Sequence, residues 1–206
     1  MFEVDTNGDG HLLLMSGGQG QPLAARSVAA ETASECSLDA VLVEAVKGGD
    51  REAFARLHQL YAPMVHGILL ARVPYGEVSD LVQDVFLVAF KKVHGLRDGA
   101  AFGGWLAMIA RNRAMDFHRR ARETEELPED VARPAATAPQ AEAAEVLGVI
   151  RGLPDAYRET LVLRLVEGMT GPEIAARTGL HPDSVRVNLH RGMKLLRAKL
   201  GVGEKR

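Results

Sequence analysis

Apolar residues recur at helical spacing through most of the chain after residue 37, and no stretch alternates between apolar and polar positions as a strand would. Asp50 and the segment Thr170-Gly-Pro-Glu173 are of the kind that caps helix N-termini, and Pro74-Tyr75-Gly76 indicates a loop. The pattern predicts an all-α fold with helices over residues 38–46, 51–69, 80–92, 102–122, 143–153, 154–167, 171–178 and 182–200.

Two segments without a helical pattern divide the chain. Residues 1–37 hold Gly-rich and small polar stretches, and we interpret them as a disordered or weakly ordered N-terminal arm. Residues 123–141 combine acidic side chains with prolines, which indicates a flexible linker. We therefore expect two small helical domains, over residues 38–122 and 142–206, joined by that linker.

The composition excludes several classes of protein. Cys36 is the single cysteine and no two histidines stand four positions apart, so we expect no disulfide and no metal site. No apolar stretch approaches the roughly 20 residues that span a bilayer, and the start lacks the basic region of a signal peptide, so we expect a cytoplasmic protein without membrane insertion. There is no nucleophile or phosphate-binding motif, so we expect neither an enzyme nor a cofactor.

The C-terminal segment has the pattern of a helix-turn-helix. Gly179 supplies the turn, and Val185, Leu189, Met193 and Leu196 form an apolar stripe that leaves the opposite face of the last helix to solvent. From His181 to the C-terminus seven basic residues stand against two acidic ones, although the whole chain has a net charge of −2. A basic helix of this kind fits a DNA major groove, while a solvated face on an ordinary packed helix is the alternative. The residues expected to contact duplex DNA, the recognition set, are Ser184, Arg186, Val187, His190, Arg191 and Lys194.

Two further patterns lie in the N-terminal helical block. The helix predicted over residues 80–92 carries carboxylates and an apolar side chain at helical spacing, which is typical of a protein-binding surface; an ordinary acidic helix N-terminus is the alternative. We call this surface the acidic stripe; it consists of Asp80, Gln83, Asp84, Leu87 and Lys91. The helix predicted over residues 102–122 follows Trp105 with several arginines, a combination that can bind single-stranded nucleic acid. For Trp105 we favour a place in the core, and for the arginines a function over a solvated face.

These segments resemble a known family. Asp80–Phe90 and Phe102–Arg120 are similar to region 2 of sigma-70-type RNA polymerase sigma factors, and Leu153–Leu161 and Gly168–Lys194 are similar to region 4. No room remains for a region 3, a layout that resembles the extracytoplasmic-function (ECF) group. The run Ala100–Gly104 is less polar than the loop that the family has before its tryptophan.

The resemblance implies a sigma factor that binds core RNA polymerase, directs promoter recognition, melting of the −10 element and initiation, and is controlled by an anti-sigma factor. The acidic stripe would bind the clamp helices of the largest subunit, region 4 would bind the flap, and the recognition set would read the −35 element. The −10 set would be Arg97, Asp98, Arg111, Asn112, Asp116, Arg119 and Arg120. A helix-turn-helix regulator that works without polymerase and dimerises through the N-terminal helices is the alternative.

Overall fold

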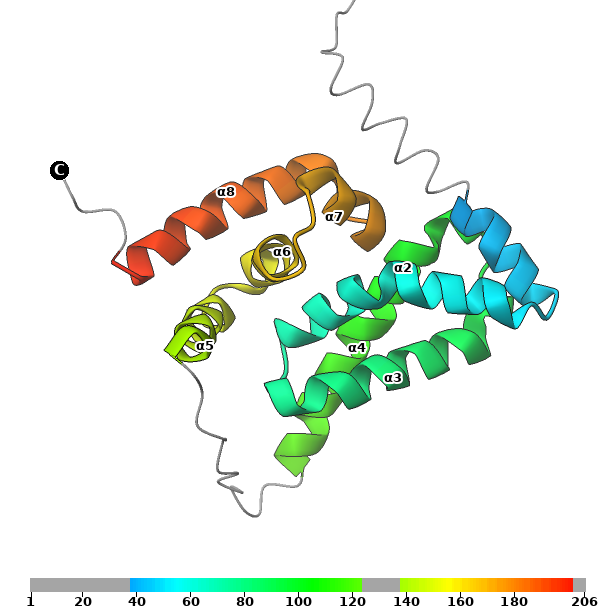
Figure 1. Cartoon of the computed structure of the whole chain (residues 1–206), viewed down its shortest axis with the longest axis horizontal. Coiled ribbons are helices and arrows are strands. Elements are labelled where there is room, and N and C mark those ends of the chain that lie inside the picture. The colour runs from blue at the N-terminus through cyan, green and yellow to red at the C-terminus, as the bar shows by residue number, and fades with distance from the viewer. Residues whose placement is uncertain (1–37, 124–137, 202–206) are drawn as a thin grey trace, which may run out of the picture.

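The computed structural model describes residues 38–123 and 138–201, and within these ranges the regular structure is helical (Figure 1). The N-terminal unit, residues 38–123, begins with a helix over residues 38–47. It continues with α2 (Arg51–Leu70), α3 (Tyr75–Lys92), the short 3₁₀ turns η1 (Val93–Gly95) and η2 (Gly99–Ala101), and α4 (Phe102–Glu123). The C-terminal unit, residues 138–201, contains α5 (Ala138–Arg151), α6 (Asp155–Leu165), α7 (Gly171–Thr178) and α8 (Pro182–Lys199).

The helices of the N-terminal unit pack around apolar side chains at the predicted spacing. Leu57 and Ile68 of α2, Val85 of α3, and Phe102 of α4 have no exposed surface. Burying one such side chain contributes about 1.5–3 kcal/mol, so this core accounts for the association of the three long helices. Trp105 is half-buried, and its ring lies 5.8 Å from that of Phe102, which confirms the interpretation of this residue as part of the core.

The start of α3 differs from the prediction. Tyr75 and Gly76, expected in a loop, form the first turn of α3. Pro74 is the N-cap residue, and its carbonyl oxygen accepts a hydrogen bond from the N–H of Glu77 at 3.1 Å. A proline before a helix removes no hydrogen bond from it. The negative charge of Glu77 in the first turn interacts favourably with the helix dipole. The loop prediction over these residues is therefore wrong.

The helix-turn-helix has the local structure that the sequence predicts. Thr170 and Glu173 form a capping box at the head of α7, and Gly179 ends that helix with φ +71°, a conformation that glycine adopts without strain. α8 starts at Pro182, as expected, and the His181 side chain accepts a hydrogen bond from the N–H of Asp183. α8 lies close to α6 at Gly192, where an added Cβ would lie 3.1 Å from the side chain of Leu161.

The linker prediction is wrong at its C-terminal end. α5 begins at Ala138, within the segment expected to be a linker, and ends at Arg151. Pro139 is its second residue, a position at which proline costs no hydrogen bond, so the proline that indicated a linker is compatible with a helix. The arm over residues 1–37 and the rest of the expected linker, residues 124–137, lie outside the described residues.

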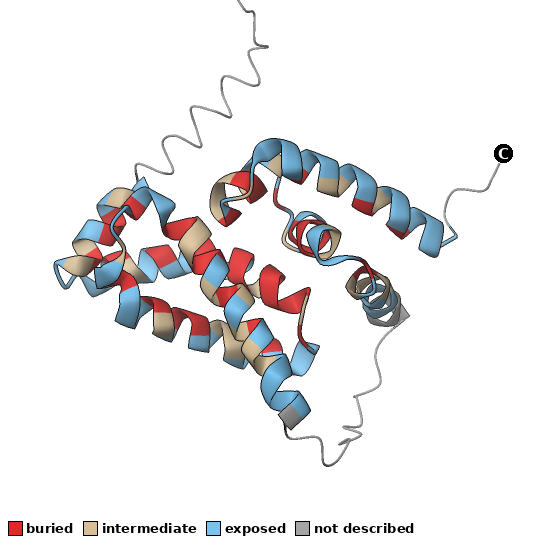
Figure 2. Cartoon of the chain, turned by 180° about the vertical axis from the view of Figure 1, so that it is seen from behind, coloured by how far each residue is buried: buried red, intermediate tan, exposed pale blue. Residues whose placement is uncertain are grey.

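The two units pack against each other, which the expectation of two tethered domains does not include. α2 and α4 of the N-terminal unit contact α6 and α7 of the C-terminal unit, and α6 lies between α8 and α2 (Figure 1). Buried positions run through both units as one apolar cluster, while most of α8 is exposed on its outer side (Figure 2). This packing determines which candidate site residues are accessible.

Candidate functional site

All five residues of the acidic stripe are exposed on α3. The core-facing positions of the same helix, Val78, Val85 and Ala89, are buried, so the stripe is the side of α3 that packing leaves to solvent. Leu87 keeps 56% of its surface exposed and Phe90 keeps 45%, and neighbouring apolar side chains on one helix face form a patch of the kind that a partner can cover.

An aromatic groove borders one side of the stripe. Gln83 and Leu87 line it together with residues that the sequence analysis did not assign to any site: Arg51, Phe54, His58, Phe86 and Phe90. The ring centroids of Phe54 and Phe90 lie 4.9 Å apart in an edge-to-face arrangement, and Phe90 is 45% exposed. Phe90 follows Leu87 at helical spacing, and this was the signal available in the sequence.

A second groove lies between α3 and α4 and has walls of opposite charge. Glu77, Asp80 and Asp84 line it from α3, and Arg113 and Arg120 line it from α4. The acidic stripe therefore lies on a ridge between an apolar groove and a polar one. Such a ridge offers a partner both apolar contact and charged groups that set its orientation.

The −10 set does not lie on one face. Arg97 and Asp98 are exposed in the segment between η1 and η2, where the Asp98 side chain accepts from the N–H of Ala100. Arg111 and Arg120 are nine positions apart on α4, which places them on opposite sides of the helix. Of the remaining members, Asn112 is exposed, and Asp116 pairs with the exposed Arg119 at 3.0 Å.

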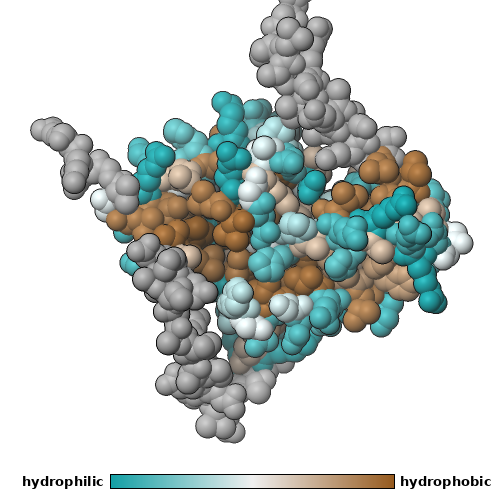
Figure 3. Space-filling model, in the orientation of Figure 1, coloured by the Kyte–Doolittle hydropathy of each residue, from teal (hydrophilic) through white to brown (hydrophobic). Residues whose placement is uncertain are grey.

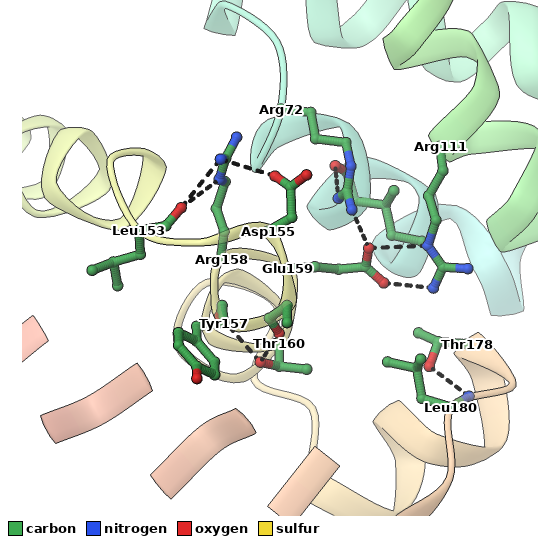
Figure 4. Close-up of polar contacts among 12 residues, drawn as sticks. Arg72, Arg111, Leu153, Asp155, Tyr157, Arg158, Glu159, Thr160, Thr178 and Leu180 are labelled. Carbon is green, nitrogen blue, oxygen red and sulfur yellow. Dashed lines mark hydrogen bonds and ion pairs between the residues drawn. The ribbon is translucent and has the colours of Figure 1, made fainter. Parts of the chain in front are cut away.

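Arg111 faces the C-terminal unit and contacts a residue that the sequence analysis did not single out. Its guanidinium donates two hydrogen bonds to the carboxylate of Glu159 on α6, at 2.7 and 3.1 Å (Figure 4). Arg72, just after α2, pairs with the same carboxylate at 2.7 Å. In this arrangement the Arg111 guanidinium is therefore bound to the Glu159 carboxylate.

The recognition set is accessible. All six of its members are exposed on α8, while Val185 and Leu196 of the same helix are buried. Arg186 makes an ion pair with Asp183 at 3.3 Å, and both side chains lie at the surface, where water and salt weaken such a pair. The face that sequence spacing assigns to DNA is therefore the face that α8 presents to solvent.

Other kinds of site have no candidate in the part of the chain that the structure describes. No three His, Cys, Asp or Glu side chains gather there in a way that could hold a metal ion. None of the helices in residues 38–123 and 138–201 combines the length and the apolar character needed to cross a membrane. Figure 3 shows hydrophobic surface near α5 and α8 and near the first helix. The first helix has two exposed large apolar side chains, Leu38 and Val41.

Comparison with known proteins identifies the family. The family models Sigma-70 region 2 and Sigma-70, region 4 match residues 57–124 and 143–196. RNA polymerase sigma factor CarQ of Myxococcus xanthus is 34% identical over 166 residues, which cover 77% of this chain and 95% of the relative. ECF RNA polymerase sigma factor SigD of Mycobacterium tuberculosis is 35% identical over 180 residues, covering 79% and 84%.

Solved structures agree in fold. The structure of CnrH in complex with the cytosolic domain of CnrY matches with a TM-score of 0.59 and 26% identity, over 81% of this chain and 99% of that one. The sigma factor RpoE from Bartonella quintana, solved with the anti-sigma factor NepR, matches in fold with a TM-score of 0.53 and 22% identity, over 73% and 98%. The two family-model matches, in the order region 2 then region 4, and the similar sigma factors show the family. This chain belongs to the sigma-70 family of RNA polymerase sigma factors, in its extracytoplasmic-function group.

Proposed function

We propose that this chain binds core RNA polymerase through the acidic stripe and directs it to promoters through α4 and α8. The observation that carries the proposal is the division of α8 into a buried apolar side and an exposed recognition set within a complete helix-turn-helix. A helix of this kind places its N-terminal residues against base edges in the major groove. The recognition set would read the −35 element as duplex DNA.

The polymerase contact would combine charge with apolar burial. Asp80 and Asp84 supply negative charge, and Leu87 and Phe90 supply exposed apolar surface beside the aromatic groove. Interface energy usually concentrates in a few apolar or aromatic anchors, and charged groups around them set orientation and association rate. The clamp helices of the largest subunit would occupy this ridge, and the flap would contact the C-terminal unit.

The −10 element would bind along α4 and the segment before it. Arg119 and Asn112 are exposed, and the surface of α4 that carries Met115, His118 and Arg122 is hollowed. Basic side chains beside apolar ones provide phosphate contacts and surfaces on which unpaired bases stack. Arg111 would join them only after it leaves Glu159.

We further propose that an anti-sigma factor controls the protein, because relatives of the same fold have been solved with such partners. Sigma factors as a family are not enzymes, and the role proposed for this chain consists of binding alone. Because bacterial RNA polymerase works in the cytoplasm, the proposal includes a cytoplasmic location.

A charge reversal on the stripe tests the polymerase contact. Asp84→Arg should weaken binding to core polymerase by about 2–5 kcal/mol, since it replaces one partner of an interfacial charge pair with a like charge. Binding is measured by fluorescence anisotropy of the labelled chain against core polymerase. Glu145→Arg makes the same charge change at an exposed position on α5 and serves as the matched control.

Equal polymerase affinities of Asp84→Arg and Glu145→Arg would contradict the proposed contact, provided that both variants keep the helical circular dichroism of the wild type. Transcription in vitro from a panel of promoters separates the two functions. A sigma factor supports initiation only together with core polymerase, whereas a helix-turn-helix regulator would bind promoter DNA alone and would start no transcripts.

A further inference from the structure

A buried carboxylate joins the two units. Glu159 of α6 is 4% exposed, and its two oxygens pair with Arg72 and Arg111 of the N-terminal unit, each at 2.7 Å (Figure 4). A carboxylate out of water is costly unless charged partners and hydrogen bonds compensate for the lost hydration. Both partners come from the other unit, so Glu159 is well solvated only when the units are apart and well paired only when they are together.

Other polar contacts cross the same boundary. His66 of α2 pairs with Glu167 at 2.7 Å. The Arg151 side chain donates to the carbonyl oxygen of Leu70 at 3.0 Å, and the Arg177 side chain donates to that of Leu60 at 3.1 Å. Three parts of the C-terminal unit therefore hydrogen-bond to α2: the end of α5, the segment that follows α6, and α7.

Glycines allow the backbones to approach. A Cβ added to Gly103 would lie 2.6 Å from the carbonyl oxygen of Arg177, a distance that real Cβ atoms do not show. Gly104 lies against Gly179, where an added Cβ would be 3.4 Å from the Cα of that residue. Gly103 and Gly104 stand where the family has a more polar loop. Because they lack a Cβ, the turn of the helix-turn-helix packs closely against the start of α4.

We propose that this closed arrangement is an autoinhibited state in which the Glu159 carboxylate occupies the position of a DNA phosphate on Arg111. Arginine binds carboxylates and phosphates with the same paired hydrogen bonds, so the two ligands compete for one guanidinium. The Glu159 latch, defined as Glu159 with Arg72 and Arg111, withholds Arg111 from single-stranded DNA until the units separate. The inference rests on the proposed function, because that function assigns Arg111 to DNA.

The first experiment measures DNA binding by the full chain without polymerase. The variant is Glu159→Gln, which keeps the side-chain shape and removes the charge that competes with phosphate. The control is Glu145→Gln, which removes the same charge from an exposed position of α5. The probe is a fluorescein-labelled single-stranded oligonucleotide of random sequence, titrated at one fixed salt concentration.

Glu159→Gln should bind the oligonucleotide about tenfold more tightly than the wild type, a typical coupling between two conformational states. Glu145→Gln should change the affinity by less than about twofold, since an exposed charge contributes little. Equal affinities of the two variants would overturn the proposal that Glu159 competes with DNA.

The second experiment measures closure directly. Spin labels on cysteines introduced at the exposed positions Lys92 and Lys199, with Cys36 replaced by serine, report the distance between the units by pulsed electron resonance. Glu159→Gln and Arg72→Gln should both broaden the distance distribution and shift it to longer values. Arg72 is not in the −10 set, so its variant tests the latch apart from DNA contact. Distributions that match the wild type in both variants would overturn the latch.

Polymerase binding and the distance distribution together distinguish a failure of the proposed function from a failure of the Glu159 latch. If neither the wild type nor Glu159→Gln binds core polymerase but the distance distribution shifts, the proposed function is wrong and the latch between the units is supported. If polymerase binding is intact and the distribution does not shift, the latch alone is wrong.

Discussion

Arg186 and Lys194 lie on the same exposed face of α8 but at different places along it. Arg186 is in the first turns of the helix, the end that a recognition helix points toward base edges, while Lys194 lies more than two turns further on. Arginine makes paired hydrogen bonds to guanine, whereas lysine acts as a compact charge. The two residues should therefore differ in what they contribute: Arg186 to sequence preference and Lys194 to general affinity.

Substituting each residue with alanine tests this difference. Arg186→Ala should remove about 1–3 kcal/mol of base discrimination at one or two positions of the −35 element. Lys194→Ala should weaken binding to all promoters alike and lower the dependence on salt, because a phosphate contact carries no sequence information. The measurement is transcription of a panel of −35 variants by core polymerase with each protein, at two salt concentrations.

The two substitutions serve as controls for each other, since both remove an exposed cation from the same helix. If Arg186→Ala keeps the sequence preference of the wild type, Arg186 is not a reading residue, although the family assignment is unaffected. A salt dependence that Lys194→Ala leaves unchanged would remove that residue from the phosphate contacts.

At the same scale, Glu159 shows what sequence reasoning misses. It lies within the Leu153–Leu161 segment that resembles region 4, yet no local pattern distinguishes it from an ordinary solvated glutamate of α6. Its partners Arg72 and Arg111 are 87 and 48 positions away and belong to the other unit. Residue spacing predicts neighbours on one helix, but it carries no information about which helices pack.

Among the secondary-structure elements, the ends that depend on local chemistry are the predictable ones. Asp50 caps α2 by accepting from the N–H groups of Glu52 and Ala53, and the capping box of α7 follows the sequence motif directly. The starts of α3 and α5 were missed because a proline before or within the first turn suits either a loop or a helix. Packing resolves that ambiguity: Val78 in the early part of α3 is buried.

The capping box of α7 should make stability depend on pH. The N–H of Thr170 donates to the Glu173 carboxylate at 2.7 Å, and this hydrogen bond, with a second from the Thr170 hydroxyl, holds the pKa of Glu173 below its ordinary value. A lowered pKa means that the contribution is fully present above the ordinary value and is lost as the pH falls through the lowered one. Residue 173 cannot titrate in the variant Glu173→Gln. The free energy of unfolding of the wild type, relative to that of this variant, should therefore decrease in acid.

Urea unfolding at neutral pH and at about pH 3 measures this difference, with the variant cancelling the effect of the other carboxylates. Thr170→Ala provides the companion variant: it should cost about 1 kcal/mol at neutral pH through loss of the cap. A wild-type advantage that is the same at both pH values would show that the Glu173 hydrogen bonds are not maintained in solution.

Across the whole molecule, the sequence predicts the units better than their arrangement. The helices, the helix-turn-helix and the exposed faces of α3 and α8 follow from periodicity and capping residues. The contact between the units depends on a shared apolar cluster, on the close approach of Gly103 and Gly104 to α7 and its turn, and on dispersed polar pairs. It places Arg111, a residue assigned to DNA, against α6. Candidate site residues on outer helix faces are thus accessible as predicted, while one at the boundary between units is not.

The contact between the units should also loosen as the pH rises, because of His66. Its ring nitrogen Nδ1 lies 2.7 Å from Oε1 of Glu167, and this hydrogen bond raises the pKa of His66 above its ordinary value, with partial burial opposing the shift. A raised pKa in the closed state means that the stabilisation is fully present below the ordinary value of about 6.5 and is lost as the pH rises through the raised value. The distribution of distances between labels at Lys92 and Lys199 should then broaden in the wild type as the pH rises from below about 6.5 through the raised pKa of His66. Glu167→Gln removes the charge that holds the proton on His66 and should flatten this dependence, so an equal pH dependence in both proteins would exclude His66 as its source.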